Sequence, residues 1–461
     1  MMKDNWKLIT ENWQLYITSV ALLVMLYYYV KGKINERKRH GKHLRKRSKR
    51  RAEGIIFGKQ GLKLITSPTM KEGGVLAVGG SGSGKTASFL IPTLRKWRGT
   101  ALVVDISGDI SKNVPDPEKV IYEPENGKSR PYDVFGYIDS LESKNEQNEA
   151  LQNLAYYIIP EKAKEDASAY YEAQARILLQ SALVAYYQEA KKDFIPICKK
   201  VVELPIETLI EDLSASGNEL AQTLIASYEG MPEKTLATTK QELDRNLLFF
   251  ATNTNIERAV KRDENAITPK ILETKSLYIV IDDVKMTLYS PLFRLITAQA
   301  MQYMYSRQNG AKPKILLALD EFTSLKLNAE QISDALKKLR KKNVRIIVCT
   351  QSVIDLDTVY TRDIRKAMLE NFTFKVVLSA TEPETQKYFS DLAGEVTVEN
   401  ISHSFNGEHI GETVTYQREK LIYPEEFGRL DKHLILFHPK GVMWLKKNYY
   451  FKWYDKYIPR R

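Results

Sequence analysis

The chain is poor in cysteine. Its 461 residues include only Cys198 and Cys349, which lie far apart, and Cys349 closes a run typical of a buried strand. A disulfide is therefore not expected, and the chain suits a reducing compartment. Internal repeats are also absent, and the single low-complexity segment is a basic run near the N-terminus.

Over most of its length the chain has little net charge. The formal charge is +12, and the segment between Lys31 and Arg51 carries +11 of it, from twelve Lys or Arg and the single acid Glu36. The rest is nearly neutral, so any DNA-binding surface there must be local. Three roles remain open for the basic run: contact with anionic lipid, contact with DNA, and control of membrane topology. We favour lipid contact combined with control of topology.

One stretch lacks charge altogether. Residues 12–30 form nineteen uncharged positions, about 28 Å of helix, which matches a bilayer core of about 30 Å. Trp13 at one end and Tyr27, Tyr28 and Tyr29 at the other are typical of interfacial aromatics. The positive charge follows the stretch and no small-residue cleavage site is present, unlike in a signal peptide. We therefore expect one uncleaved transmembrane helix with its C-terminal side in the cytoplasm.

A glycine-rich loop is the most informative motif. An apolar, strand-like run at 75–78 precedes it and a helical pattern at 87–90 follows. In such a loop the backbone N–H groups cradle phosphates, Lys85 reaches the β/γ oxygens and the Thr86 hydroxyl binds Mg²⁺. The motif therefore predicts a site for ATP and Mg²⁺, with a flexible Gly/Ser turn as the alternative. It has the pattern G-x-x-x-x-G-K-[ST] and consists of Gly79, Gly80, Ser81, Gly82, Ser83, Gly84, Lys85 and Thr86.

Apolar runs alternate with helical patterns on both sides of a long helical region. Continuous apolar strands separated by helices predict a mostly parallel sheet covered on both faces. Residues 140–262, approximately, have helical apolar spacing throughout. The predicted fold is an α/β phosphate-loop NTPase with an inserted all-α domain and an N-terminal transmembrane helix. Its expected strands lie at 75–78, 101–104, 277–281, 315–319, 344–349 and 374–378.

Two strand-like runs end in paired acids, and either pair could serve the phosphate loop. One ends in Asp282-Asp283 and the other in Asp320-Glu321. The second pair is favoured because it supplies both roles in order: Asp320 supports Mg²⁺ through water and Glu321 is the base that activates water. The first pair is interpreted as a turn at the end of a strand.

Two further residues are candidates for completing the site. Gln351 follows the next strand along the chain, where a glutamine can sense the γ-phosphate or orient water, although an exposed turn residue is the alternative. Motor ATPases often take an arginine from the next subunit. The basic stretch 337–342 offers Arg340, against the simpler interpretation of a solvated helix face.

In their order along the chain, these motifs resemble those of the coupling proteins of type IV secretion systems, the membrane-anchored conjugative DNA-transfer ATPases. The helical region falls where that family carries its all-α domain. The resemblance covers roughly residues 55–450. Beyond the phosphate loop it rests on segments 89–92, 104–109, 320–322, 350–352, 382–385, 392–394 and 423–427.

The resemblance implies a RecA-like ATPase in the bacterial cytoplasmic membrane, with its body in the cytoplasm. It implies a homo-oligomeric ring, expected to be a hexamer, that moves single-stranded DNA with its attached relaxase toward secretion channel components. Most members carry two N-terminal spans, whereas one is expected here. The expected division is an external tail at 1–12, the span at 13–30, a basic linker at 31–55, the ATPase domain at 56–138 and 263–461, and the all-α domain at 139–262.

Two other functions remain open. A receptor that recruits protein effectors for secretion would use the same scaffold, with ATP serving assembly. A chromosome-segregation type DNA translocase would share the chemistry, but such proteins usually read duplex DNA through a C-terminal winged-helix module, for which residues after 450 leave no room.

Overall fold

The structure is a computed structural model that describes residues 45–47, 52–68, 73–161, 167–187, 193–406 and 409–451. The predicted external tail and transmembrane helix, and all of the basic run except β1 (Arg45–Arg47), lie outside the described residues. Within the described ranges, none of the helices combines the length and the hydrophobicity needed to cross a bilayer.

A sheet with seven parallel strands positions the candidate site. The strands have the spatial order β10-β4-β9-β8-β5-β7-β6, and all neighbours pair in parallel. Six of them coincide with the predicted apolar runs and are buried almost throughout, so the expectation of a mostly parallel α/β sheet is confirmed. The seventh, β6, was not predicted and is only partly buried. The strands are β4 (Gly74–Val78), β5 (Thr100–Ile106), β6 (Val120–Tyr122), β7 (Leu277–Ile281), β8 (Ile315–Leu319), β9 (Val344–Thr350) and β10 (Phe372–Val377).

Five antiparallel strands extend this sheet beyond β10, and the sequence patterns did not predict them. They continue the order as β13, β14, β2, β3 and β1, which makes the sheet mixed. Strands from the beginning and from the end of the described chain therefore lie side by side in this part of the sheet. These strands are β2 (Ile56–Gln60), β3 (Lys63–Thr66), β13 (His433–His438) and β14 (Gly441–Lys446), with β1 at the outer edge.

Two hydrophobic cores cover the two faces of the sheet. Side chains alternate along each strand, so Leu76 and Val78 of β4 point to one face and Val75 and Ala77 to the other. The second face is covered by the turn after the phosphate loop, helix α2 (Ile91–Leu94) and α3 (Asp109–Asn113). The first face is covered by longer helices: α11 (Met286–Ser306), α12 (Ala329–Lys338), α13 (Arg362–Asn371) and α14 (Pro383–Ala393).

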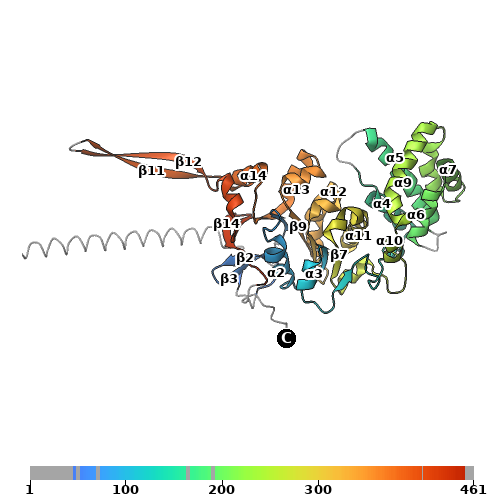
Figure 1. The fold of residues 1–461 in the computed structure, drawn as a ribbon, viewed down its shortest axis with the longest axis horizontal. Coiled ribbons are helices and arrows are strands. Elements are labelled where there is room, and N and C mark those ends of the chain that lie inside the picture. The colour runs from blue at the N-terminus through green and yellow to red at the C-terminus, as the bar shows by residue number, and fades with distance from the viewer. Residues whose placement is uncertain are drawn as a thin grey trace, which may run out of the picture.

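In the described part of the chain, seven α-helices lie between β6 and β7 in the sequence and form one end of the molecule (Figure 1). Arg294 of α11, which is buried, donates hydrogen bonds to the carbonyl oxygens of Tyr157 (2.6 Å) and Ile158 (2.7 Å) at the end of α4, and so ties the helices to the sheet layer. They are α4 (Lys144–Ile158), α5 (Ala167–Tyr186), α6 (Phe194–Glu203), α7 (Ile206–Ser214), α8 (Glu219–Ile225), α9 (Glu233–Thr252) and α10 (Thr254–Ala259).

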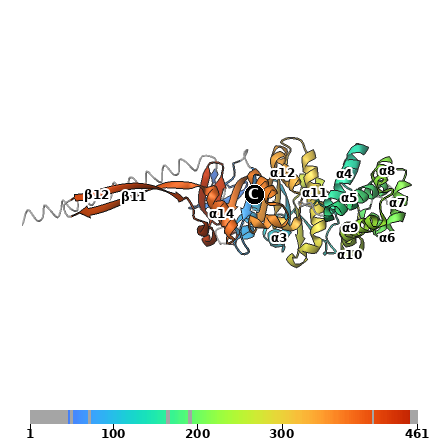
Figure 2. The same ribbon diagram turned by 90° about the horizontal axis from the view of Figure 1, so that it is seen from above.

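A long hairpin projects from the opposite end of the molecule. Strands β11 (Glu395–Asn406) and β12 (His409–Lys420) pair only with each other and extend away from the body in both views (Figures 1 and 2). The described elements are therefore arranged in a line, with the helical end on one side, the sheet and its covering helices in the middle, and the hairpin on the other side.

Candidate nucleotide site

The phosphate loop begins where β4 ends. The N–H of Gly79 donates to the carbonyl oxygen of Thr350 (3.1 Å), which fixes the start of the loop against β9. Gly82 (φ +72°) and Gly84 (φ +94°) have backbone angles that other residues rarely adopt, so the motif's glycines are needed for its shape. A π-helical turn, η1 (Lys85–Leu90), follows and runs without a break into α2, where Pro92 donates no backbone N–H.

Lys85 lies folded over its own loop. Its side chain is buried, and its Nζ donates to the carbonyl oxygen of Gly79 (2.5 Å) and approaches that of Gly80 (3.5 Å). The same Nζ lies 3.7 Å from Oε1 of Glu321. The ammonium group is therefore at the mouth of the loop, between the loop and the acid at the end of β8.

Thr86 and Asp320 meet directly. The Thr86 hydroxyl donates to Oδ2 of Asp320 at 3.0 Å, although the two residues are 234 positions apart. Burial, together with the negative charge of Glu321, raises the pKa of Asp320 to about 6, although the Thr86 hydrogen bond and the charge of Lys85 oppose the rise. The other oxygen, Oδ1, is buried and has no hydrogen-bond partner among the described residues.

An unpartnered carboxylate oxygen beside a threonine hydroxyl suits a divalent cation. Oxygen ligands and one or two carboxylates are what Mg²⁺ uses beside phosphates. Thr86 and Asp320 are therefore the residues that would hold Mg²⁺, Thr86 directly and Asp320 through water. A bound cation would also stabilise the charged form of Asp320, which burial alone disfavours.

Glu321 and Gln351 lie opposite each other at the carboxyl ends of β8 and β9. Nε2 of Gln351 donates to Oε2 of Glu321 at 3.4 Å. Strand β9 lies between β4 and β8, so Gln351 at its end is between the phosphate loop and Glu321. Glu321 itself has a left-handed backbone (φ +52°), an uncommon conformation that often marks a functional turn.

The turn after Glu321 is held by an aromatic contact. The rings of Phe322 and Tyr360 stack with centroids 6.1 Å apart. The Tyr360 hydroxyl donates to the carbonyl oxygen of Leu327 at 2.7 Å. The segments that follow β8 and β9 are thereby joined a second time, away from the Gln351–Glu321 bond.

The competing acidic pair lies elsewhere. Strand β7 is separated from β4 by β5, β8 and β9. Asp282 is exposed and its Oδ1 accepts from the N–H of Val284 (3.1 Å), so it caps the next turn, and Asp283 is also exposed. The structure thus brings Asp320 and Glu321, rather than Asp282 and Asp283, to the phosphate loop.

Arg340 does not reach the site within its own chain. It is exposed on the turn that precedes β9, at the end of the parallel strands opposite the phosphate loop. A role as an arginine supplied to a neighbouring subunit stays a prediction. Asp105, at the end of β5, is buried and its carboxylate accepts from the N–H groups of Ile110 (3.0 Å) and Ser111 (2.6 Å), so it fixes the start of α3.

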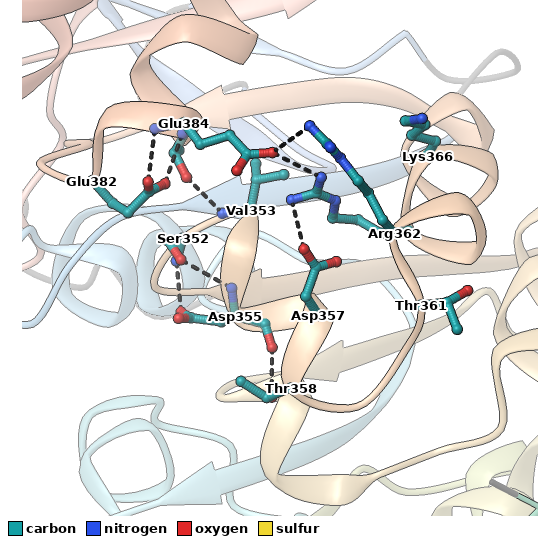
Figure 3. A network of polar contacts seen from close by, with 12 residues as sticks. Ser352, Val353, Asp355, Asp357, Thr358, Thr361, Arg362, Lys366, Glu382 and Glu384 are labelled. Atoms are coloured by element: carbon teal, nitrogen blue, oxygen red, sulfur yellow. Dashed lines mark hydrogen bonds and ion pairs between the residues drawn. The ribbon is translucent and has the colours of Figure 1, made fainter. Parts of the chain in front are cut away.

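A polar network directly after Gln351 was not found from the sequence (Figure 3). Ser352 and Asp355 bond reciprocally: the N–H of Ser352 donates to Oδ2 of Asp355 (2.7 Å), and the N–H of Asp355 donates to Oγ of Ser352 (3.0 Å). The N–H of Val353 donates to the buried hydroxyl of Thr385 on α14 (3.0 Å). The Ser-x-x-Asp spacing, a helix-start signal, could have indicated this turn.

The network continues through a buried arginine. Arg365 of α13 lies 3.2 Å from Oδ2 of Asp357 and 3.1 Å from Oε1 of Glu384, and Arg362 also pairs with Glu384 (3.2 Å). Figure 3 shows these acids converging on the arginine side chains from the segment after β9 and from α14. The segment after β9 is therefore attached to α13 and α14, and these contacts hold Gln351 in place beside the phosphate loop.

Comparisons with known proteins identify the family. A family model described as type IV secretory system conjugative DNA transfer matches residues 30–458. Protein VirD4 of Rhizobium rhizogenes is 23% identical over 438 residues, which cover 90% of this chain and 64% of VirD4. The chain spans about three-fifths of the length of the curated relatives that it matches.

Solved structures of the plasmid coupling protein TrwB have the same fold. TrwB in complex with the ATP analogue ADPNP gives a TM-score of 0.69 at 21% identity, covering 88% of this chain and 92% of TrwB. TrwB in complex with ADP and Mg²⁺ gives a TM-score of 0.64 at 20% identity, covering 84% of this chain and 86% of TrwB.

Proposed function

The chain belongs to the type IV secretory system conjugative DNA transfer family, and from this premise we propose that it is the membrane-anchored coupling ATPase of such a system. In this role it recruits relaxase-bound single-stranded DNA and drives the DNA to the secretion channel by ATP hydrolysis. One observation carries the proposal. Residues from three distant segments meet at the carboxyl ends of the parallel strands: Lys85, Thr86, Asp320, Glu321 and Gln351.

Each of these residues has a defined task in hydrolysis. The loop from Gly79 to Thr86 cradles the triphosphate through its N–H groups, and Lys85 moves from its own loop carbonyls to the β/γ oxygens. Glu321 accepts a proton from the attacking water, and Gln351 orients that water or senses the γ-phosphate. Mg²⁺, when bound, neutralises developing charge on the phosphates. The solved structures of TrwB in complex with ADPNP and with ADP and Mg²⁺ support ATP and Mg²⁺ as the ligands.

The proposal includes an assembly and a location. Hydrolysis between subunits of a ring, with Arg340 as the candidate arginine in trans, would make the chain a homo-oligomer, expected to be a hexamer. Uncharged residues 12–30 and the basic run after them favour one span in the bacterial cytoplasmic membrane, with the ATPase body in the cytoplasm. The helices from α4 to α10 are proposed as the separate domain that receives cargo.

The test is ATP hydrolysis by the full chain in lipid, with and without single-stranded DNA, and with Glu321→Gln as the control. Strong stimulation by single-stranded DNA that the control loses is the expected result. Duplex DNA of the same sequence is the matched competitor, and preferential stimulation by duplex would favour a chromosome-segregation type translocase. If DNA leaves the rate of ATP hydrolysis unchanged but secreted proteins raise it, the result would favour a receptor for protein effectors.

A further inference from the structure

The segment after β14 returns to the phosphate loop. The N–H of Tyr450 donates to the carbonyl oxygen of Ala87 (3.1 Å), in the turn that follows the loop. The guanidinium of Arg95 lies 4.9 Å from the centre of the Tyr450 ring and donates to its carbonyl oxygen (3.4 Å). Two bonds and a cation–π contact therefore fix this segment against the start of the helix that carries Lys85 and Thr86.

This attachment places the ring of Tyr449 directly beside the loop. A Cβ atom added to Gly84 would lie 3.2 Å from Cε1 of Tyr449 and 3.4 Å from its hydroxyl oxygen. Gly84 therefore serves a second purpose besides its positive φ, because it admits the aromatic ring. The Phe451 ring, which is exposed, continues the aromatic surface, with its centroid 5.3 Å from that of Tyr449.

The strand order tells which end of a nucleotide would meet Tyr449. The groups that serve the γ-phosphate, Asp320, Glu321 and Gln351, follow β8 and β9, on one side of β4. Tyr449 follows β14, which joins the sheet on the other side of β4, beyond β10 and β13. A triphosphate held by the loop with its γ end toward Glu321 therefore carries its nucleoside toward Tyr449.

We propose that Tyr449 stacks on the base of the bound nucleotide and gives the site a preference for purine nucleoside triphosphates. This inference rests on the proposed nucleotide site and assigns its base-binding side. An aromatic face binds any base through stacking and buried area, and a purine offers more of both than a pyrimidine. Adenine and guanine would be discriminated weakly, because a ring face does not read the hydrogen-bonding edge of a base.

The test compares binding of ATP, CTP and inorganic tripolyphosphate to the full chain, by calorimetry in the presence of Mg²⁺. Tyr449→Ala should weaken ATP binding roughly tenfold and abolish the preference for ATP over CTP, while tripolyphosphate affinity stays unchanged. Tyr449→Phe, which keeps the ring, is the matched control and should bind ATP as the wild type does.

The alternatives give different outcomes. If Tyr449→Ala weakens ATP and tripolyphosphate equally, the ring only supports the loop, and the inference is overturned. If ATP affinity is unchanged in Tyr449→Ala, the base lies elsewhere and the inference fails while the proposed function survives. If the wild type binds neither ATP nor tripolyphosphate, the nucleotide site itself is wrong, and the inference falls with it.

Discussion

The ends of β7 and β8 are nearly identical in sequence pattern but differ in what surrounds them. Both strands are five buried apolar residues followed by two acids. At the end of β8, Asp320 is buried and accepts a hydrogen bond from Thr86. At the end of β7, Asp282 is exposed and caps the next turn.

Strand order accounts for this difference. β8 is two positions from β4 and β7 is four, so at about 4.8 Å per strand they lie about 10 Å and 19 Å from the phosphate-loop strand. Only the nearer distance can be bridged by the side chains of Thr86 and Asp320. An acidic pair at a strand end thus acquires a role from its neighbours in the sheet.

The largest expected difference between the two ends is in turnover. Glu321→Gln should lower ATP turnover by about 10²- to 10⁴-fold, the usual contribution of a general base, while ATP binding persists. Asp283→Asn, the corresponding change at the end of β7, should leave turnover at the wild-type rate. Steady-state hydrolysis and nucleotide binding measured on both variants test this, and equal turnover in Glu321→Gln would rule out the assignment of the base.

The second expected difference is in ATP affinity, between the phosphate loop and the segment after β7. Lys85→Ala removes the ammonium group at the mouth of the loop and should weaken ATP binding roughly a hundredfold, as for loss of one member of a buried charge pair. Lys285, after β7, pairs with Glu125 at 2.7 Å on the surface, so Lys285→Ala should leave ATP affinity unchanged. Calorimetric titration with ATP measures both affinities, and an unchanged ATP affinity in Lys85→Ala would contradict the phosphate-loop interpretation.

The dependence on Mg²⁺ offers a finer comparison. Asp320→Asn should raise the Mg²⁺ concentration needed for half-maximal hydrolysis by about 10- to 100-fold, because a group that orients metal-bound water is lost. Asp282→Asn should need the same Mg²⁺ concentration as the wild type. A titration of Mg²⁺ at saturating ATP measures both, and an unchanged requirement in Asp320→Asn would show that another residue supports the metal.

A last difference between the two strand ends concerns the pH dependence of stability without metal. Because burial raises the pKa of Asp320 to about 6 from 3.8, the folded chain favours its protonated form. The stabilisation from that proton is complete below about pH 4 and is lost as pH rises through 6, at a cost on the order of 3 kcal/mol.

Asp320→Asn should remove that loss. Denaturant unfolding with a chelator present, at pH 4 and pH 8, should show a smaller fall in stability for Asp320→Asn than for the wild type. The other carboxyl groups titrate in both proteins, so the difference between them isolates Asp320. An identical pH dependence would mean that water reaches this carboxyl.

The parallel part of the fold was predictable because its signals are local. The apolar runs at 277–281 and 315–319 coincide with β7 and β8, and the strand before the phosphate loop was expected one residue short. The antiparallel strands form two hairpins, β2–β3 and β13–β14, whose local signals were missed. Their place in the sheet depends on the contact of β2 with β14, which is nearly 400 residues later in the chain. No local pattern encodes a pairing of that separation. The domain boundaries and the catalytic roles stay predictions.

The candidate site was predictable in part for a similar reason. Lys85 and Thr86 follow from a contiguous motif whose spacing is fixed by the shape of a phosphate. Glu321 and Gln351 could be proposed because parallel strands end at the same edge of a sheet. Tyr449 and Arg365 belong to no motif, so only packing shows that they lie near the loop or near the segment that holds Gln351.

Local sequence patterns are enough to place most of the parallel strands and the loop that can hold a phosphate, because these depend on residues within a few positions of each other. Tertiary structure decided which of two acidic pairs serves that loop, and that the last described segment lies against it. Those choices depend on the order of strands in the sheet, which is set by the packing of the whole domain and not by any single segment.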